Sequence, residues 1–363
     1  MKTNSTDGLR YATSEVPVLL RLLQVCTIVE DPAQADAFVV PFPICTWQMI
    51  GWLRPPRPKV LTNLLQTVRH HLIHLNESTA SRHVLFYSLD ICFLGIGRHM
   101  PHAERTVIFT SGDDFYNSST FWRRKASSGI TIVSKAIRRQ VRFNHSLTLP
   151  KRTHRPRASP TDTSPAADDG TLARPILLFG ALDPRRNRER GVAISAIQRS
   201  AAEAKVAERV LVGDLRNFSS NGSLAVPSQL ASRSVFCLCM AGDAPSFTQR
   251  FSFVIARGCI PVRIDPFRRL PNLGQPADSF PFPSLINWRR IIVPVEGRNM
   301  SAYMDLVPRL LALEPRARAM RQYMQSVAHY LLFDGEGVQP DAASAALFEL
   351  SRHLGIDLSA PLA

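Results

Sequence analysis

A short polar cluster separates apolar residues in the stretch GDAPSFTQRFSFVIARGCIPVRIDPF, residues 242–267. The apolar residues are typical of a buried helix followed by a buried strand. Backbone N–H groups at a helix start bind anions, and an arginine one turn in adds charge-assisted hydrogen bonds to phosphate. The pattern predicts an anion site, and the alternative is an ordinary helix cap with Arg250 facing solvent. The polar residues at this predicted helix start are Asp243, Ser246, Thr248, Gln249 and Arg250.

The elements that position this cluster alternate between strands and helices. Repeated strand–helix units form a doubly wound α/β sheet, which binds ligands at the carboxyl ends of its strands. The cluster follows the third predicted strand, so it falls at such an edge. We predict strands at 175–182, 209–215, 234–240, 259–264 and 289–295, and helices at 190–205, 304–313, 315–333 and 341–354.

Residues 150–175 are rich in proline, serine, threonine and charge, which is typical of a linker or exposed loop. A second α/β domain is predicted before it, with a helix over the sequence EVPVLLRLLQV and strands at 36–44 and 83–89 and in the sequences VIFT and ITIV. The expected organisation is an N-terminal domain at 1–150, a linker at 151–174, a C-terminal domain at 175–335, and a helix with a tail at 336–363.

The composition narrows the classes of function. The 363 residues carry a net charge of +15, with 38 arginines and 6 lysines, which predicts a polyanionic partner. The chain lacks zinc-ligand spacing and aromatic RNA-binding motifs, so the sequence favours a phosphate-bearing substrate or an acidic polysaccharide over nucleic acid. No apolar run is long enough to span a bilayer, and the first fifteen residues lack the apolar core of a signal peptide.

Glycosylation motifs and cysteines bear on the compartment. Seven of the eleven asparagines begin an Asn-x-Ser/Thr motif, well above the one or two expected by chance, which predicts a glycosylated lumenal protein. The six cysteines are compatible with disulfides, but their pairing cannot be read from the sequence. Cys237 and Cys239 share one face of a predicted strand, and buried free thiols are the alternative to a disulfide there.

Five motifs in order resemble the exostosin-like glycosyltransferase family. The strongest is the strand Phe236-Cys237-Leu238 with the turn Gly242-Asp243, then Thr248-Gln249-Arg250 in place of Ser-x-Arg, and Gly258-Cys259-Ile260-Pro261-Val262. The other four are YATSE (residues 11–15), TIVEDPAQADAFVVPF (27–42), SRHVLFYSLD (81–90) and FPFPSLINWRRIIVPV (280–295). The resemblance covers nearly the whole chain.

The resemblance implies a GT-B type fold, in which two Rossmann-like domains face a cleft. It implies a nucleotide-sugar donor on the C-terminal domain, a glycan or polysaccharide acceptor in the cleft, and an inverting displacement without a divalent metal or other cofactor. It also implies a Golgi location with a type II membrane anchor, which is absent from this sequence. An incomplete reading frame is one explanation of that absence.

The resemblance assigns roles to particular residues. Candidates for the general base are His83, Asp90 and Glu15. Glu30 and Asp36 are further acidic candidates. The alternative for His83 is a structural histidine in the core. Basic residues 185, 186, 188 and 190 follow the first C-terminal strand and face either the diphosphate or solvent. The predicted donor-binding residues are Gly242, Asp243, Ser246, Thr248, Arg250, Gly258 and Arg186.

Three acidic positions of the family are replaced, by Arg82, Phe253 and Pro283. These replacements support an alternative function, an inactive subunit that binds or assembles with a partner glycosyltransferase. The intact segment from Gly242 to Val262 favours an active enzyme.

Overall fold

The computed structural model shows an α/β protein with two compact units. Unit 1 contains residues 1–154, 270–285 and 330–363, and unit 2 contains 155–269 and 286–329. The C-terminal helix therefore belongs to unit 1, where the sequence predicted a separate helix and tail. The structure describes residues 15–41, 66–87, 102, 105–110, 145–148, 174–185, 188–218, 225–240, 249–264, 280–295, 300–333 and 340–356.

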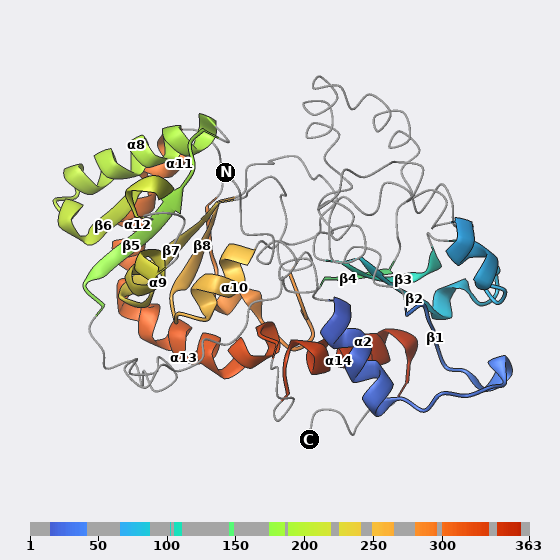
Figure 1. Ribbon diagram of the computed structural model, residues 1–363. Helices are drawn as coiled ribbons and strands as arrows, with labels where there is room; N and C mark the ends of the chain where they lie inside the picture. The colour runs from blue at the N-terminus through green and yellow to red at the C-terminus, as the bar shows by residue number, and fades with distance from the viewer. Residues whose placement is uncertain are drawn as a thin grey trace. The chain divides into compact units, whose positions relative to one another are not determined.

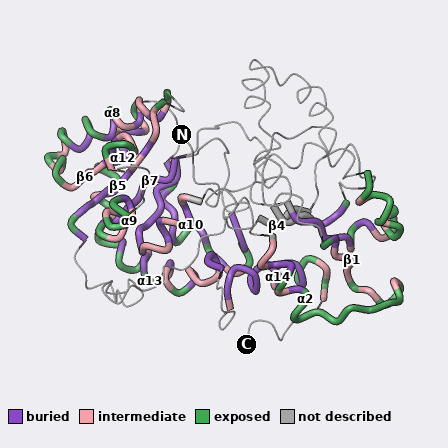
Figure 2. Tube along the Cα trace, viewed as in Figure 1, coloured by how far each residue is buried: buried purple, intermediate pink, exposed green. Residues whose placement is uncertain are grey.

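Unit 2 is built on a five-stranded parallel sheet with the order β6-β5-β7-β8-β9. Long apolar runs produce these strands because a sheet covered by helices is buried on both faces, and Figure 2 shows this burial along β5 and β7. Four strands match the predictions, but residues 288–290 form a 3₁₀ helix, so the fifth strand is shorter than predicted. The strands are β5 (Ile176–Leu182), β6 (Val210–Asp214), β7 (Ser234–Met240), β8 (Ile260–Ile264) and β9 (Val293–Val295).

Helices cover both faces of this sheet (Figure 1). Side chains of α8, α11 and α12 join alternate strand residues, such as Leu178, Leu238 and Val262, in one apolar core. Helices α9 and α10 pack against the strands from the other face. The predicted helix at 304–313 is two helices that meet at Asp305. The helices are α8 (Arg188–Glu203), α9 (Ala225–Ser232), α10 (Gln249–Ile255), α11 (Met300–Met304), α12 (Leu306–Leu313) and α13 (Ala317–Val327).

Unit 1 contains a four-stranded parallel sheet with the order β1-β2-β3-β4. Helices α2 and α14 pack against each other, and the Arg21 guanidinium lies 3.8 Å from the Asp341 carboxylate that caps α14. Strand β4 was not predicted, and the predicted strand in the sequence ITIV lies outside the described residues. The elements are α2 (Glu15–Val25), β1 (Phe38–Val39), β2 (His83–Tyr87), β3 (Val107–Thr110), β4 (His145–Thr148) and α14 (Ala342–Leu354).

The two parallel sheets with their helices confirm the predicted α/β fold class. No helix in the described ranges is long and apolar enough to cross a membrane.

Candidate anion site at the carboxyl edge of the unit 2 sheet

Arg250 lies in the first turn of α10, the helix that follows the carboxyl end of β7. The residue is partly buried, and its Nη1 atom is fully buried without a hydrogen-bond partner among the described residues. Buried guanidinium N–H groups are normally paired, because an unpaired buried donor is costly. The unpaired donor is therefore an observation that calls for a ligand or another functional explanation.

None of the described groups that shift the pKa of Arg250 is a carboxylate. Burial lowers the pKa of Arg250, the Cys239 thiol raises it, and the nearby Arg190 guanidinium lowers it. Burial raises the pKa of Cys239 to about 12, although Arg250 opposes that shift. Cys239 is therefore a neutral thiol at physiological pH, and the described part of the site contains two cations that act on each other.

Arg190 comes from the first turns of α8, directly after the loop that follows β5. It is buried, and its Nη1 donates to the carbonyl oxygen of Asp183 at 3.4 Å. The start of α8 is held from the neighbouring helix, because the Tyr303 hydroxyl donates to the Glu189 carboxylate at 3.1 Å. The position of Arg190 is therefore fixed by its own bond to the loop after β5 and by the bond between the start of α8 and α11.

The strand order places both arginines at one special position of the sheet. The chain goes outward to β6 from β5 and then returns to add β7 on the other side, so the order reverses between β5 and β7. Doubly wound sheets bind ligands at this switch point, outside the carboxyl ends of the strands. Arg190 follows β5 and Arg250 follows β7, so a buried and a partly buried cation flank the switch point, and this arrangement can bind an anion.

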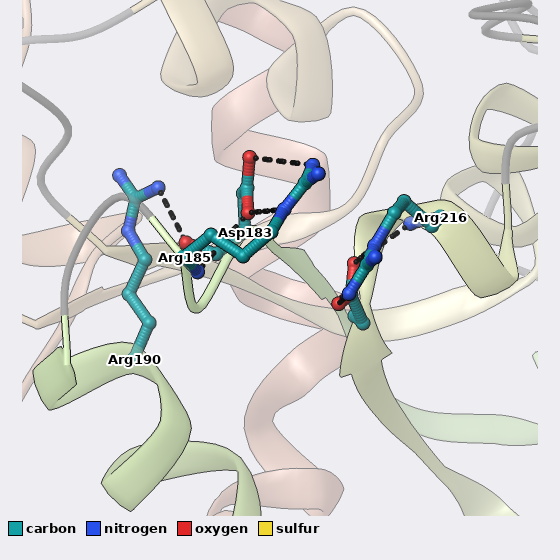
Figure 3. Close-up of polar contacts among 5 residues, drawn as sticks. Asp183, Arg185, Arg190 and Arg216 are labelled. Carbon is teal, nitrogen blue, oxygen red and sulfur yellow. Dashed lines mark hydrogen bonds and ion pairs between the residues drawn. The ribbon is translucent and has the colours of Figure 1, made fainter.

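Two ion pairs lie at the ends of β5 and β6, as Figure 3 shows. The Nε atom of Arg185 is 3.0 Å from Oδ1 of Asp183, and the Nε atom of Arg216 is 3.1 Å from Oδ1 of Asp214. In each pair the aspartate ends or follows a strand, and the arginine lies two residues later. The family motifs do not include Asp183, Asp214 or Arg216, and the repeated Asp-x-Arg spacing is the sequence signal that marks them.

Several predicted site residues lie outside the described part of the chain. Glu15 begins α2, but its side chain is among the atoms that are not described. Glu30 and Asp36 are both exposed. The residues outside the described ranges are Asp90, Arg186, Gly242, Asp243, Ser246 and Thr248, so their roles stay predictions.

His83 is a buried residue at the amino end of β2. Its Nδ1 donates to the Thr79 carbonyl at 2.9 Å, and its ring stacks on Phe38 with centroids 4.7 Å apart. Burial lowers the pKa of His83, the hydrogen bond to Thr79 raises it, and Arg82 and His74 lower it further. Parallel sheets bind ligands at the opposite, carboxyl edge, so this geometry favours the core histidine, and a catalytic role of His83 stays a prediction.

Gly258 also lies at an amino edge, between α10 and β8. Its φ of +66° is in the left-handed region, and a Cβ there would lie 2.7 Å from Nη2 of Arg174. The N–H of Gly258 closes the turn by donating to the Ile255 carbonyl at 2.9 Å. Gly258 and Arg250 are therefore at opposite ends of α10; this geometry favours a structural role for Gly258, and its donor contact stays a prediction.

A disulfide joins Cys237 of β7 to Cys259, which precedes β8, with Cα atoms 5.8 Å apart. Cys239 is free and buried. The disulfide therefore links the two ends of the segment that contains Arg250, a pairing the sequence did not reveal. Within the described ranges, no group of three or more histidine, cysteine or acidic side chains is arranged to hold a metal ion.

Comparison with known proteins agrees with the sequence resemblance. The chain is 30% identical over 142 residues to the probable glucuronoxylan glucuronosyltransferase IRX7 of Arabidopsis thaliana, which is 39% of this chain and 29% of the relative. The chain thus matches less than a third of that relative's length.

Two solved structures have a distant likeness to the chain. The crystal structure of the GtfA/B complex has a TM-score of 0.36 and 14% identity, covering 82% of this chain and 61% of that one. The pneumococcal O-GlcNAc transferase GtfA in complex with UDP and GlcNAc has a TM-score of 0.35 and 11% identity, covering 81% and 59%. Both TM-scores are low, and no conclusion rests on them.

A family model settles the relationship. The exostosin GT47 domain model matches residues 13–310, most of the chain and nearly all of the predicted motifs. The chain therefore belongs to the exostosin GT47 family.

Proposed function

We propose that the protein is a glycosyltransferase that moves a sugar from a nucleotide-sugar donor to a glycan or polysaccharide acceptor with inversion. Membership of the exostosin GT47 family supports the transferase class. The observation that carries the proposal is the buried, unpaired Nη1 of Arg250 beside Arg190 at the switch point of the unit 2 sheet.

In this proposal, Arg250 and Arg190 bind the donor diphosphate. Hydrogen bonds from a guanidinium to phosphate are charge-assisted and strengthen when water is excluded. Negative charge grows on the diphosphate as the sugar departs, so fixed cations stabilise the transition state more than the ground state. These cations supply the neutralisation that a divalent metal provides in other enzymes, and we propose that no metal is needed. Arg186 and residues 242–248 are further candidates for this role.

Inversion requires a single base that takes the proton of the acceptor hydroxyl. A positioned base contributes about 10²–10⁴ in rate. His83 is a core residue at the amino edge of its sheet, and Glu30 and Asp36 are exposed. Glu15 and Asp90 are therefore the candidates we retain for this role.

We further propose that the protein acts in the Golgi lumen on a glycan under construction. The sequence motifs for N-glycosylation and the family resemblance support this location. Because the relative IRX7 is named as a glucuronosyltransferase, nucleotide-linked glucuronic acid belongs among the first donors to test.

A second candidate function is an inactive subunit that assembles with a partner glycosyltransferase. The observation that favours it is Phe253, which occupies a usual acidic position of the family. The Arg257 guanidinium lies 5.3 Å from the centre of the Phe253 ring. Phe253 therefore makes an aromatic contact with an arginine at a position where a carboxylate would make polar contacts.

The test is a thermal-shift screen of UDP and GDP sugars, because a ligand that binds the folded state raises its melting temperature. We expect one class of donor to raise it and Arg250→Ala to weaken that donor by about 10- to 100-fold, the worth of one charged hydrogen bond. Arg199→Ala, an exposed arginine further along α8, is the matched control and should leave the affinity unchanged. A folded protein that binds no nucleotide sugar and hydrolyses none would favour the inactive subunit.

A further inference from the structure

Arg321 is a charged residue on the buried face of α13. It shares that face with Ala317, Met324 and Val327, which have the spacing of an apolar helix stripe that packs on a core. Arg321 is 7% exposed, and no hydrogen bond or ion pair joins its guanidinium to any other described residue. Buried charged groups are normally paired, so Arg321 calls for a partner that the described residues do not supply.

The usual explanation of an arginine at a core position is a buried stem with the charged head in water. The Nε atom of Arg321 belongs to the charged head, and it is fully buried without a hydrogen-bond partner. The guanidinium therefore lies mostly out of water, where a hydrogen bond to an anion is stronger than at an open surface.

Helix α13 lies along the amino edge of the unit 2 sheet. It begins directly after the 3₁₀ helix η11 (Glu314–Arg316), whose Glu314 binds Arg209, the residue just before β6. It also contacts the 3₁₀ helix η10 (Trp288–Arg290), which precedes β9. Figure 1 shows α13 along the lower end of unit 2. A ligand at Arg321 is therefore separate from the proposed diphosphate site at the carboxyl edge.

The surroundings of Arg321 are basic. Residues 315–333 contain no aspartate or glutamate, and η10 and β8, which α13 contacts, contain none either. The carboxylate of Glu314 is already bonded to the Arg209 guanidinium. Arg318 is exposed and lies one turn before Arg321 on the same side of the helix, so it adds a second positive charge.

A third cation is held on the outer side of the same helix. The exposed Arg290 guanidinium of η10 lies 3.9 Å from the centre of the Tyr323 ring. The Tyr323 hydroxyl is fixed in turn, because it accepts the backbone N–H of Asn287 at 2.8 Å. The positive charge thus extends from α13 to η10, which suits a polymer with repeated negative charges better than one small anion.

We infer that α13 and η10 form an accessory site for an acidic polysaccharide, in which Arg321 and Arg318 bind a carboxylate or sulfate group. The inference rests on the proposed function, because it assigns a charge to the glycan that the enzyme extends. The planar fork of a guanidinium matches a carboxylate or a tetrahedral oxyanion. The net charge of +15 agrees with a polyanion, and the proposed diphosphate site uses only two of the 38 arginines.

The test measures polysaccharide binding without any donor, by calorimetry at low ionic strength, where charge contacts are least screened. The probes are polygalacturonate for carboxylate, dextran sulfate for sulfate, and neutral dextran. We expect the native protein to bind at least one acidic polymer and not dextran. Arg321→Met should weaken that binding about 10-fold, the size expected for one charge-assisted hydrogen bond. Methionine keeps an unbranched apolar stem in the helix face.

Two further variants keep the test decisive. Arg318→Ala changes an exposed side chain and should weaken binding about 3-fold. Arg352→Met removes an exposed arginine from α14 of unit 1 and is the matched control, because the same charge is lost at another place. Urea unfolding of Arg321→Met should give the native midpoint or a higher one, since a buried unpaired charge is removed.

Several outcomes would overturn the accessory site. Equal losses for Arg321→Met and Arg352→Met would show that only net charge matters. Native protein that binds neither acidic polymer, or that binds duplex DNA more tightly than both, would exclude the proposed ligand. A lower unfolding midpoint with unchanged binding would make Arg321 structural. Nucleotide affinity at Arg250 is measured separately, so loss of the accessory site leaves the proposed function standing, and native protein that binds acidic polymer but no nucleotide would overturn only the donor site.

Discussion

Two arginines lie at opposite edges of the unit 2 sheet, and their surroundings differ. At the amino edge, Nη1 of Arg174 donates to the carbonyls of Ser234 at 2.9 Å and Arg257 at 3.3 Å, and Nη2 donates to Arg257 at 3.2 Å. At the carboxyl edge, Nη1 of Arg250 is buried without a partner among the described residues. Arg174 thus joins β7 to the end of α10 through their carbonyl groups, and only its Nε is buried without a hydrogen-bond partner among the described residues, whereas on Arg250 the terminal Nη1 is.

The difference separates stability from function within one sheet. Arg174 stabilises the ends of α10 and β7, because its guanidinium donates charge-assisted hydrogen bonds to their carbonyl oxygens. A buried arginine with an unpaired donor costs stability in the absence of a ligand. The three predictions that follow probe the two edges, beginning with the largest expected effect.

The largest effect is expected at the amino edge, for Arg174→Ala. The substitution removes the hydrogen bonds that the carbonyl oxygens of Ser234 and Arg257 accept from a buried guanidinium, so we expect a loss of about 3 kcal/mol in the free energy of unfolding, measured by urea denaturation. Arg174→Lys should recover part of that loss. Donor affinity of the folded protein should be unchanged, and a selective loss of affinity at full stability would reverse the assignment of this edge.

Gly258→Ala is expected to have the next largest effect. The left-handed φ of Gly258 and the 2.7 Å approach of a Cβ to Nη2 of Arg174 both disfavour alanine. Together they should lower the free energy of unfolding by about 2 kcal/mol, measured in the same urea experiment. Gly355→Ala, a left-handed glycine with open space around it, is the control and should lose less. Equal losses at both positions would show that contact with Arg174 adds nothing.

The smallest effect concerns the pH dependence of the ion pair between Asp214 and Arg216. Hydrogen bonds from Arg216 lower the pKa of Asp214 to about 2, below the unfolded value of about 3.9. A carboxylate whose folded pKa is depressed adds stability above the unfolded pKa and loses it as pH falls toward the folded value. Asp214→Asn should therefore lower the urea midpoint slightly at about pH 7, and the difference from the native protein should shrink as the pH falls toward about 2, where half of the Asp214 carboxyl groups are protonated in the folded state. Exposed Glu208→Gln is the control, and a difference that persists in acid would contradict the ion pair.

The sequence predicted the unit 2 sheet well because its strands are continuous apolar runs. It failed where tertiary packing decides the conformation. Residues 289–292 read as a strand, but Trp288 and Ile291 are buried in a 3₁₀ turn before β9. Strand β4 carries the sequence HSLT, whose composition gives no strand signal, and it becomes a strand by pairing with β3.

The sequence predicted part of the candidate site. The Gly-Asp turn and the apolar helix indicated Arg250, since an arginine in the first turn of such a helix either binds an anion or faces solvent beside a helix cap. Spacing alone could not show that His83 and Gly258 lie at amino edges, because motif order says nothing about which end of a strand faces a ligand. The partner of Cys237 was equally hidden, because Cys259 becomes its neighbour only when β7 and β8 pair.

The most direct test of the central claim measures nucleotide affinity and unfolding free energy together in Arg250→Ala. We predict a loss of about 10- to 100-fold in affinity for the bound nucleoside diphosphate. We also predict that the free energy of unfolding without ligand stays within about 1 kcal/mol of the native value or rises, because a cation with a buried, unpaired donor atom is removed. Unchanged affinity with a loss of about 3 kcal/mol in stability would make Arg250 a structural residue like Arg174 and would contradict the account.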